Sequence, residues 1–414
     1  MRHWPTLAAV SGVLALAACG RGAPTLPAAG AEPELRIGLA DGAANVALGG
    51  DGELFVTDDG NGQPIASIPA GERWSAVPEG PGVALVRPDG SRTPAHPGIS
   101  AVNVTENRFA MADGRRYRGR LNVVRSAAGL LLVNRVGLEG YLAGVIGLEM
   151  GPRRPDELQA LLAQAIVSRT FAVRNRGRWE ARGYDLTSDT RDQVYNGVAA
   201  ETEQVWNALR ASVGLVITYQ GQPIEAYFHS TCGFRTAAVD EAFHSAQARP
   251  YLRSISDASG GGHFYCDISP KFRWREEWDE ASLRTILTRT LPTLMPLGGD
   301  GLQRVTDVQV SKTSPSGRVA ELRIVFPRGD VRVQGPDVRG ILRPAADRLL
   351  QSTAFQLFVT KSGDEVTHLV AVGAGSGHGV GFCQWGAIGR ARAGQAYAHI
   401  VTTYFPGTTI EKLY

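Results

Sequence analysis

LEGYLAGVIGLEM, at residues 138–150, marks the point where the pattern of the chain changes from strand to helix. Its apolar side chains recur at helical spacing, and Gly151-Pro152 ends the run. Before it, residues 35–136 hold short alternating runs broken by Gly, Asp, Asn and Pro, such as 53–56, 82–86 and 130–133. That pattern is typical of strands and hairpins.

The sequence after residue 150 predicts further helices and then strands. Pro155, Asp156 and Glu157 are a helix start signal, and a buried stripe follows at Leu158, Leu161, Leu162, Ala165 and Ile166. A third helix is expected near 202–213, and a hairpin of 215–219 with 224–228. Three alternating runs over 305–333 and a short helix at 336–342 come next. We therefore predict an α+β fold, with the early helices packed on antiparallel sheet.

The first residues of the chain predict export. A short basic start precedes an apolar stretch at residues 7–18, too short to span a bilayer, and LAAC-G follows at 16–20. We expect a signal peptide at 1–18, a lipid on Cys19 that anchors the protein to a membrane at the periplasmic or outer surface, and a flexible tether at 19–34. An ordinary secretory signal with an incidental cysteine is the alternative.

The bulk composition excludes some classes of protein. The 414 residues are 43% hydrophobic and 20% charged, which suits a packed core. The net charge of +3 lacks the strong basic excess of a dedicated nucleic-acid binder, so no nucleic acid is expected as a partner. No dinucleotide fingerprint is present either, because the glycines near the C-terminus lack a βαβ unit. We expect no cofactor.

Glu149 is the first candidate for chemistry. It closes an apolar helix, where apolar surroundings and the negative end of the helix both raise the pKa of a carboxyl group. A carboxylic acid that stays protonated near neutral pH can protonate a glycosidic oxygen. A solvated glutamate at the end of a short helix is the alternative.

Two other polar stretches are candidates for ligand binding. Residues 184–197 are dense in hydrogen-bonding side chains, which suits either a sugar-binding loop or a polar turn anchored by Tyr195. Glycine stands at every second position from 373 to 381, around His378, which indicates backbone held close to a ligand or to neighbouring chain.

The mature chain keeps three cysteines, Cys232, Cys266 and Cys383. Export permits disulfides, so we predict a Cys232–Cys266 disulfide. The alternative is a zinc site in which His229 and His263 join those two cysteines, although the spacing resembles a zinc motif only loosely. Cys383 is either a buried small side chain or a nucleophile.

Five segments in order resemble the stage II sporulation protein D family, also called the SpoIID/LytB domain. They are residues 138–150, 164–172, 185–197, 229–236 and 377–387. The sequence departs from the family pattern at Phe234, Cys383 and Trp385. On this basis residues 121–414 are assigned to the family domain and 35–120 to a separate β-rich region.

The resemblance implies a lytic transglycosylase that acts on the glycan strands of peptidoglycan, with Glu149 in the position of the catalytic acid. The matched segments also offer hydrogen-bonding side chains for the sugar at Arg169, Gln193, Tyr195, His229, His378 and Gln384. The rival expectation is a protein without activity of its own that enhances a separate wall amidase, which would then be its partner.

Overall fold

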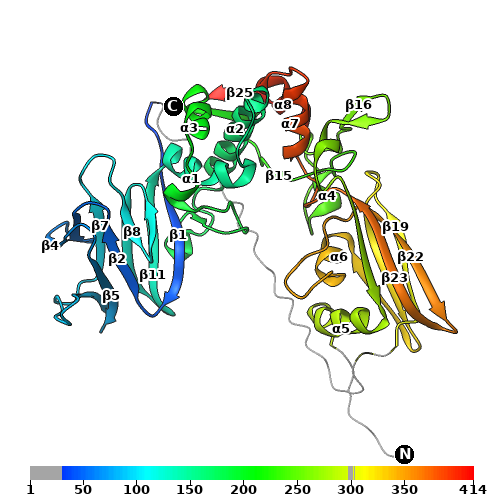
Figure 1. Ribbon diagram of the computed structural model, residues 1–414, viewed down its shortest axis with the longest axis horizontal. Helices are drawn as coiled ribbons and strands as arrows, with labels where there is room; N and C mark the ends of the chain where they lie inside the picture. Colours follow the sequence, from blue (N-terminus) through cyan, green and yellow to red (C-terminus); the bar gives the residue numbers. More distant parts are fainter. Residues whose placement is uncertain (1–29, 297–301, 303) are drawn as a thin grey trace, which may run out of the picture.

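The computed structural model describes residues 30–296, 302 and 304–414 (Figure 1). The predicted signal peptide, Cys19 and most of the tether lie outside these residues. The described chain combines helices with several mainly antiparallel sheets, so the predicted α+β class is confirmed.

The first β region contains two sheets that share one hydrophobic core. A seven-stranded sheet has the order β12-β1-β11-β10-β7-β3-β4, and a five-stranded sheet has the order β6-β5-β2-β8-β9. Alternation sets the buried face, as in β3, where Leu54 and Val56 are buried and Phe55 is exposed. The strands are β1 (Glu34–Ala43), β2 (Val46–Gly50), β3 (Leu54–Asp58), β4 (Pro64–Ile68), β5 (Arg73–Glu79), β6 (Gly82–Val86), β7 (Gly98–Asn103), β8 (Ala110–Ala112), β9 (Arg115–Tyr117), β10 (Arg120–Ser126), β11 (Gly129–Gly137) and β12 (Leu186–Thr187).

The chain does not divide into two cores near residue 120. Strand β10 begins at Arg120 and lies between β7 and β11, in the middle of the larger sheet. The helices that follow pack on the same core. The β-rich region and the helices after it are therefore one folding unit.

The helices predicted around residues 138–213 are present. Helix α2 lies at the centre and contacts α1, α3, α7 and α8. The first helices are α1 (Leu138–Met150), η1 (Pro155–Glu157), α2 (Leu158–Asn175), η2 (Glu180–Arg182), η3 (Gly197–Ala200) and α3 (Glu203–Ala211).

Two glycines let η3 and the loop before it lie directly against α1. A Cβ on Gly147 would stand 1.9 Å from the carbonyl oxygen of Ala200, and one on Gly144 would stand 2.3 Å from the Tyr195 ring. Gly151, with φ of 62°, ends α1 and donates its N–H to the Gly147 carbonyl at 3.0 Å. The position of Glu149 is thus set by the η3 segment packed on one face of α1 and by the turn at Gly151.

The C-terminal segment returns to the first unit. Strand β24 pairs in parallel with β15, and β25 pairs with β13. The predicted hairpin is shorter than expected, because residues 224–227 leave β14 and lead into β15, which takes a different partner. These elements are β13 (Leu215–Tyr219), β14 (Gln222–Pro223), β15 (Phe228–His229), β24 (Phe382–Cys383), α7 (Gln384–Arg392), α8 (Tyr397–Tyr404) and β25 (Thr409–Lys412).

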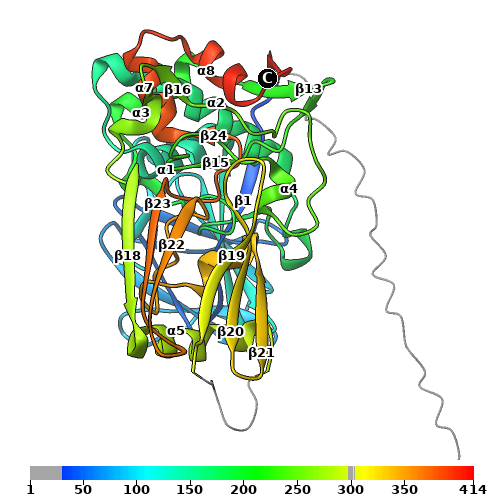
Figure 2. The same cartoon turned by 90° about the vertical axis from the view of Figure 1, so that its right-hand side faces the viewer.

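A second unit, with its own core, interrupts the first between residues 273 and 374. Two three-stranded sheets, β18-β23-β22 and β19-β20-β21, lie side by side below the helices of the first unit (Figure 2). The three strands predicted over 305–333 form the second of these sheets. Its elements are β18 (Arg273–Asp279), α5 (Glu280–Thr290), η5 (Leu291–Thr293), β19 (Asp307–Thr313), β20 (Val319–Phe326), β21 (Gly329–Gln334), α6 (Gly335–Ile341), β22 (Phe355–Ser362) and β23 (Glu365–Ala374).

A connecting segment joins the two units. It contains α4 (Val239–Ala242), β16 (Ala258–Gly260), β17 (His263–Phe264) and η4 (Tyr265–Ile268), and η4 packs on α7. Among the described residues no helix is both long and apolar enough to cross a bilayer.

Candidate active site

Glu149 lies in the last turn of α1 and is half-buried. Burial raises the pKa of its carboxyl above the usual range, and a hydrogen bond from Gln384 opposes that shift. The Gln384 amide Nε2 donates to Glu149 Oε2 at 3.1 Å. A half-buried carboxyl with one neutral donor is suited to exchange a proton with a ligand.

Gln384 is the first residue of α7 and is 7% exposed. Its position is fixed by the chain on both sides. Cys383 caps α7 by accepting the Gly386 N–H at 3.3 Å, and the Trp385 N–H donates to the Ser230 carbonyl at 3.0 Å. The start of α7 is therefore tied to the segment around β15.

Arg153 and Trp385 make a further contact between these two segments. The Arg153 guanidinium lies 5.7 Å from the centre of the Trp385 ring. Arg153 follows the turn that ends α1, and Trp385 follows Gln384. Sequence reasoning did not select Arg153. Its place directly after the Gly151-Pro152 turn, close to Glu149 along the chain, was the available signal.

Arg169, a predicted sugar contact, is wholly buried. Its guanidinium donates to both carboxylate oxygens of Glu139, at 2.8 and 2.7 Å, and to the Leu215 carbonyl at 3.1 Å. This geometry contradicts a sugar-binding role for Arg169, because its donors are engaged inside the protein. The burial of Arg169 could have been predicted from the sequence, because Arg169 continues the buried stripe of Ala165 and Ile166 on α2.

The loop at 184–197 also directs its polar groups inward. Asp185 accepts from the Arg36 side chain and backbone, each at 2.8 Å. Tyr195 donates its hydroxyl to Asn134 Oδ1 at 2.8 Å, and Gln193 accepts from the Tyr141 hydroxyl at 3.3 Å. Gln193 and Tyr195 are buried, so the alternative of a polar turn describes this loop better than a sugar-binding loop.

His229 and His378 lie next to each other, with ring centres 5.6 Å apart. His378 Nε2 contacts the Phe228 carbonyl at 2.8 Å, and His229 Nδ1 contacts the Val380 carbonyl at 3.0 Å. Burial, together with the charge of Arg318, lowers the pKa of His229 to about 3. Burial, together with the neighbouring His229, lowers the pKa of His378 to about 3. Both imidazoles are therefore neutral near pH 7 and hold the two strand segments together.

The glycines of residues 373–381 bring backbone close to neighbouring chain, as their pattern predicted. A Cβ on Gly375 would stand 2.4 Å from the Thr231 carbonyl oxygen, and one on Gly381 would stand 2.3 Å from that of Tyr227. Of the six predicted sugar-binding residues, Gln384 is the one with a hydrogen bond to Glu149.

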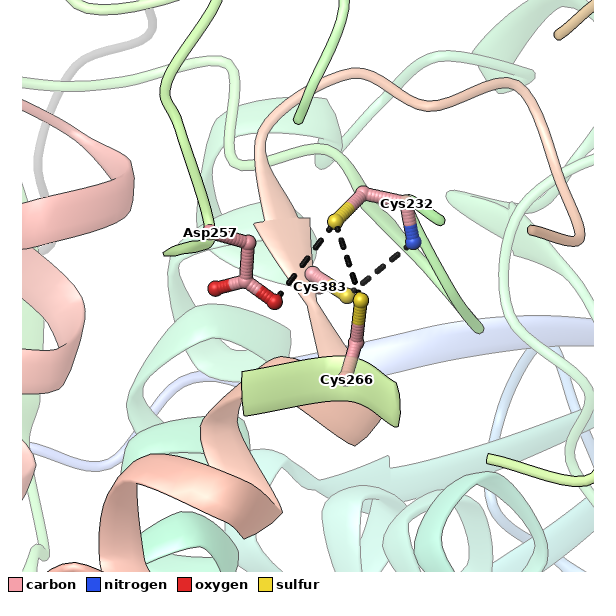
Figure 3. Close-up of side chains that lie close together, drawn as sticks. All are labelled: Cys232, Asp257, Cys266 and Cys383. Carbon is pink, nitrogen blue, oxygen red and sulfur yellow. Dashed lines mark hydrogen bonds between the residues drawn. The ribbon is translucent and has the colours of Figure 1, made fainter. Parts of the chain in front are cut away.

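The three cysteines converge, and all three thiols are free in the structure (Figure 3). Cys232 Sγ lies 3.5 Å from Cys266 Sγ, so the predicted disulfide is not formed. His263 is exposed and bound to Asp267 at 3.2 Å, which removes it from the expected zinc ligands. Cys383 and Asp257 lie beside Cys232 and Cys266, where the expected zinc site had His229 and His263. Nothing in the sequence around Asp257 had indicated its role.

The comparisons with known proteins agree with this arrangement of motifs. Residues 126–219, which carry α1, α2 and Glu149, match a family model described as Stage II sporulation protein. Stage II sporulation protein D of Bacillus subtilis is 29% identical over 296 residues, which cover 68% of this chain and 76% of that protein. The chain thus contains a stage II sporulation protein domain and is similar to stage II sporulation protein D over two thirds of its length.

Other relatives extend the match. An uncharacterized protein of Brachyspira hyodysenteriae is 28% identical over 310 residues, or 74% of this chain and 75% of that protein. The amidase enhancer of Bacillus subtilis is 27% identical over 338 residues, which cover 74% of this chain but 45% of that protein. Residues 263–381, close to the limits of the second unit, match a domain of unknown function.

A cavity of about 910 Å³ lies away from Glu149. It opens at the C-terminal end of α2, where Arg174, Arg176 and Arg178 line it together with Glu180 and Glu225. Glu149 is instead joined to α7, which packs near the other end of α2, against η1. The cavity and the candidate acid are thus separate features.

Proposed function

We propose that this protein cleaves the glycan strands of peptidoglycan as a lytic transglycosylase, with Glu149 as its acid and then its base. One observation carries the proposal. Glu149 is a half-buried carboxyl whose pKa is raised by burial, and the neutral Gln384 side chain donates a hydrogen bond to it at 3.1 Å. The match to the stage II sporulation protein family model and to stage II sporulation protein D supports peptidoglycan as the substrate class.

The proposed reaction needs one carboxyl group. Protonated Glu149 gives its proton to the oxygen of the glycosidic bond, and the C1–O bond breaks. The resulting carboxylate takes the proton of the C6 hydroxyl of the same sugar, whose oxygen bonds to C1 and closes an anhydro ring. The proton returns to Glu149, and water is not consumed. A hydrolase would need a second carboxylate or a positioned water.

Gln384 acts as a positioning residue in this scheme. Its amide N–H binds one carboxylate oxygen, which fixes the direction of the carboxyl group and stabilises the anion that forms after the first proton transfer. Because the donor is neutral, the carboxylate remains basic enough to accept the second proton.

The second candidate function is enhancement of a wall amidase. It rests on the match to the amidase enhancer of Bacillus subtilis, of which the chain covers 45%. In that case the protein would bind glycan and a separate amidase, and Glu149 would have no chemical role.

We further propose that the protein acts outside the cytoplasm. A signal peptide at 1–18 and a lipid on Cys19 would hold the folded units at the membrane surface, through the tether at 19–34. Peptidoglycan strands would then be within reach.

Incubation of the purified full-length protein with peptide-free and with peptide-bearing glycan strands tests the proposal. Mass analysis should find 1,6-anhydro ends, which are lighter by one water than the reducing ends of hydrolysis. Reducing ends would indicate a hydrolase instead. If neither end forms, and the protein accelerates glycan release by an added wall amidase, the enhancer function replaces the proposed one.

A further inference from the structure

Four side chains from four separate segments meet in the interior, next to the start of α7. They are Cys232, Asp257, Cys266 and Cys383, and each is 0% exposed. One sulfur or oxygen atom from each lies within 4.8 Å of the others. Figure 3 shows the three sulfurs and the carboxylate turned toward a common centre. We call these four residues the cysteine cluster.

The spacing within the cysteine cluster suits a tetrahedral ion. A zinc–sulfur bond is about 2.3 Å, so sulfurs around one zinc ion stand about 3.8 Å apart. Cys232 Sγ lies 3.5 Å from Cys266 Sγ and 3.6 Å from Asp257 Oδ2. Small shifts would bring all four atoms to bonding distance of one ion.

The surroundings of Cys383 favour a thiolate, which is the form that binds metal. Two backbone N–H groups donate to its sulfur, that of Cys232 at 3.2 Å and that of Gly386 at 3.3 Å. The sulfur also caps the N-terminus of α7, where the helix favours negative charge. A Cys232–Cys266 disulfide would use neither this sulfur nor the carboxylate of Asp257.

Asp257 is held as an oriented ligand would be. Its Oδ1 accepts from the Tyr404 hydroxyl at 2.7 Å and from Arg390 at 3.1 Å. Its other oxygen, Oδ2, faces the thiol of Cys232. Outer hydrogen bonds of this kind fix the direction of metal-binding side chains.

The buried charges around the cysteine cluster balance when a divalent ion is present. Three thiolates and one carboxylate carry four negative charges. Arg390 and the buried Arg318, which donates to the Cys232 carbonyl at 3.0 Å, supply two positive charges. Among the described residues, Nε and one terminal nitrogen of Arg318 have no hydrogen-bond partner. With protonated thiols Arg318 would lose the charge of the nearby Cys232 and Cys383 sulfurs and keep Glu241 as an anionic neighbour, and a buried cation with less compensation is costly.

We propose that Cys232, Cys266, Cys383 and Asp257 bind one zinc ion, and that the ion has a structural role. Four protein ligands leave no open position, which is typical of structural rather than catalytic zinc. Zinc suits a set of three thiolates and one carboxylate because it has no redox chemistry and prefers tetrahedral geometry. The ion would fasten η4 and the start of α7 to the β15 segment. It requires nothing of the proposed glycan chemistry.

Metal analysis and thiol titration of the purified full-length protein test the proposal. We expect one zinc per chain, and three internal thiols that react after denaturation with a chelator. Replacement of zinc by cobalt should give an intense thiolate-to-cobalt charge-transfer absorption in the near ultraviolet. Because this measurement uses the unaltered chain, it does not depend on the folding of any variant.

Variants then assign the ligands. Cys383→Ser and Asp257→Asn should lose zinc. Tyr404→Phe keeps all four ligands but removes one hydrogen bond from Asp257, so zinc affinity should fall by about 10- to 100-fold. His263→Ala is the matched control and should keep its zinc, because His263 is exposed and bound to Asp267.

Two results would overturn the zinc site. One is peptide mapping that finds Cys232 and Cys266 joined in a disulfide, with Cys383 as a lone thiol. The other is a reduced chain that binds neither zinc nor cobalt when either metal is supplied in excess.

Discussion

Gln384 and Glu149, which stand 235 positions apart in the sequence, are joined by a hydrogen bond of 3.1 Å. The bond connects the end of α1 to the start of α7. It therefore links residues 126–219, which match the stage II sporulation protein model, to the returning C-terminal segment. The chain between them includes the whole second unit. The environment of Glu149 is therefore completed only when the C-terminal segment has packed on α2.

Glu149→Gln should abolish glycan cleavage while the fold and glycan binding persist. The amide keeps the size of the side chain but can neither give nor take the proton. General acid–base catalysis contributes about 10²- to 10⁴-fold, so the rate should fall by about that factor. Release of anhydro products measures the rate, and a glycan pull-down measures binding. Cleavage at the rate of the unaltered protein would remove Glu149 from the mechanism.

Gln384→Leu should move the alkaline limb of the pH–rate profile to higher pH. Burial already raises the pKa of Glu149, and the Gln384 hydrogen bond partly lowers it by stabilising the anion. The acid must be protonated, so activity is lost as pH rises through this pKa. Without the donor the pKa rises further and protonation persists to higher pH. A profile that shifts to lower pH, or that does not move, contradicts this role for Gln384.

The sequence predicted individual helices well because the spacing of apolar residues and the start and stop signals of a helix lie within one short stretch of chain. The apolar run before Gly151 predicted α1 with the bounds that the structure gives, and the Pro155 start signal predicted the beginning of the next helical segment. The desolvation of Glu149 followed from the same run. The assignments of Arg169, Gln193 and Tyr195 to sugar binding depended on tertiary contacts, and these three side chains are buried and bonded to protein.

Long-range assembly explains what the sequence could not predict. The cysteine cluster needs four segments that come together only in the folded chain, and no spacing connects Asp257 with Cys383. The second core was also unpredicted, because its strands read like those of the first unit. Separation of the two cores depends on which strands pair, and alternation alone does not determine pairing.

Gly147→Ala should lower both stability and activity. A Cβ at this position would overlap the Ala200 carbonyl oxygen, so α1 or the η3 segment must shift, at a cost of about 1–3 kcal/mol. The shift would also displace Glu149 from Gln384. Gly340→Ala in α6 is the matched control, because its Cβ meets open space and alanine favours a helix. Urea denaturation and the cleavage assay compare the two variants. Equal stability would show that the Ala200 segment moves away from the new Cβ at little cost in free energy.

Cys19→Ser should release the protein from the membrane or leave it unprocessed. The apolar stretch that ends at LAAC-G predicts cleavage before Cys19 and a lipid on its sulfur. Membrane fractionation and the mass of the mature N-terminus measure both events. A Cys19→Ser protein that is cleaved and fractionates with membranes as the unaltered protein does would contradict anchoring through a lipid on Cys19.

Arg169→Met should destabilise the fold strongly without reducing glycan affinity in the fraction that remains folded. The substitution leaves Glu139 without its buried bidentate partner, and loss of one member of a buried pair costs about 3–5 kcal/mol. Replacing Glu139 by Leu in the same chain should restore much of that stability, since no charge is then left unpaired.

Arg191→Met is the matched control for Arg169→Met, because its partner Asp189 is exposed and stability should change little. Chemical denaturation measures the stabilities, and glycan titration separates the two roles of Arg169. A variant of normal stability that binds glycan poorly would restore Arg169 to the sugar-binding residues.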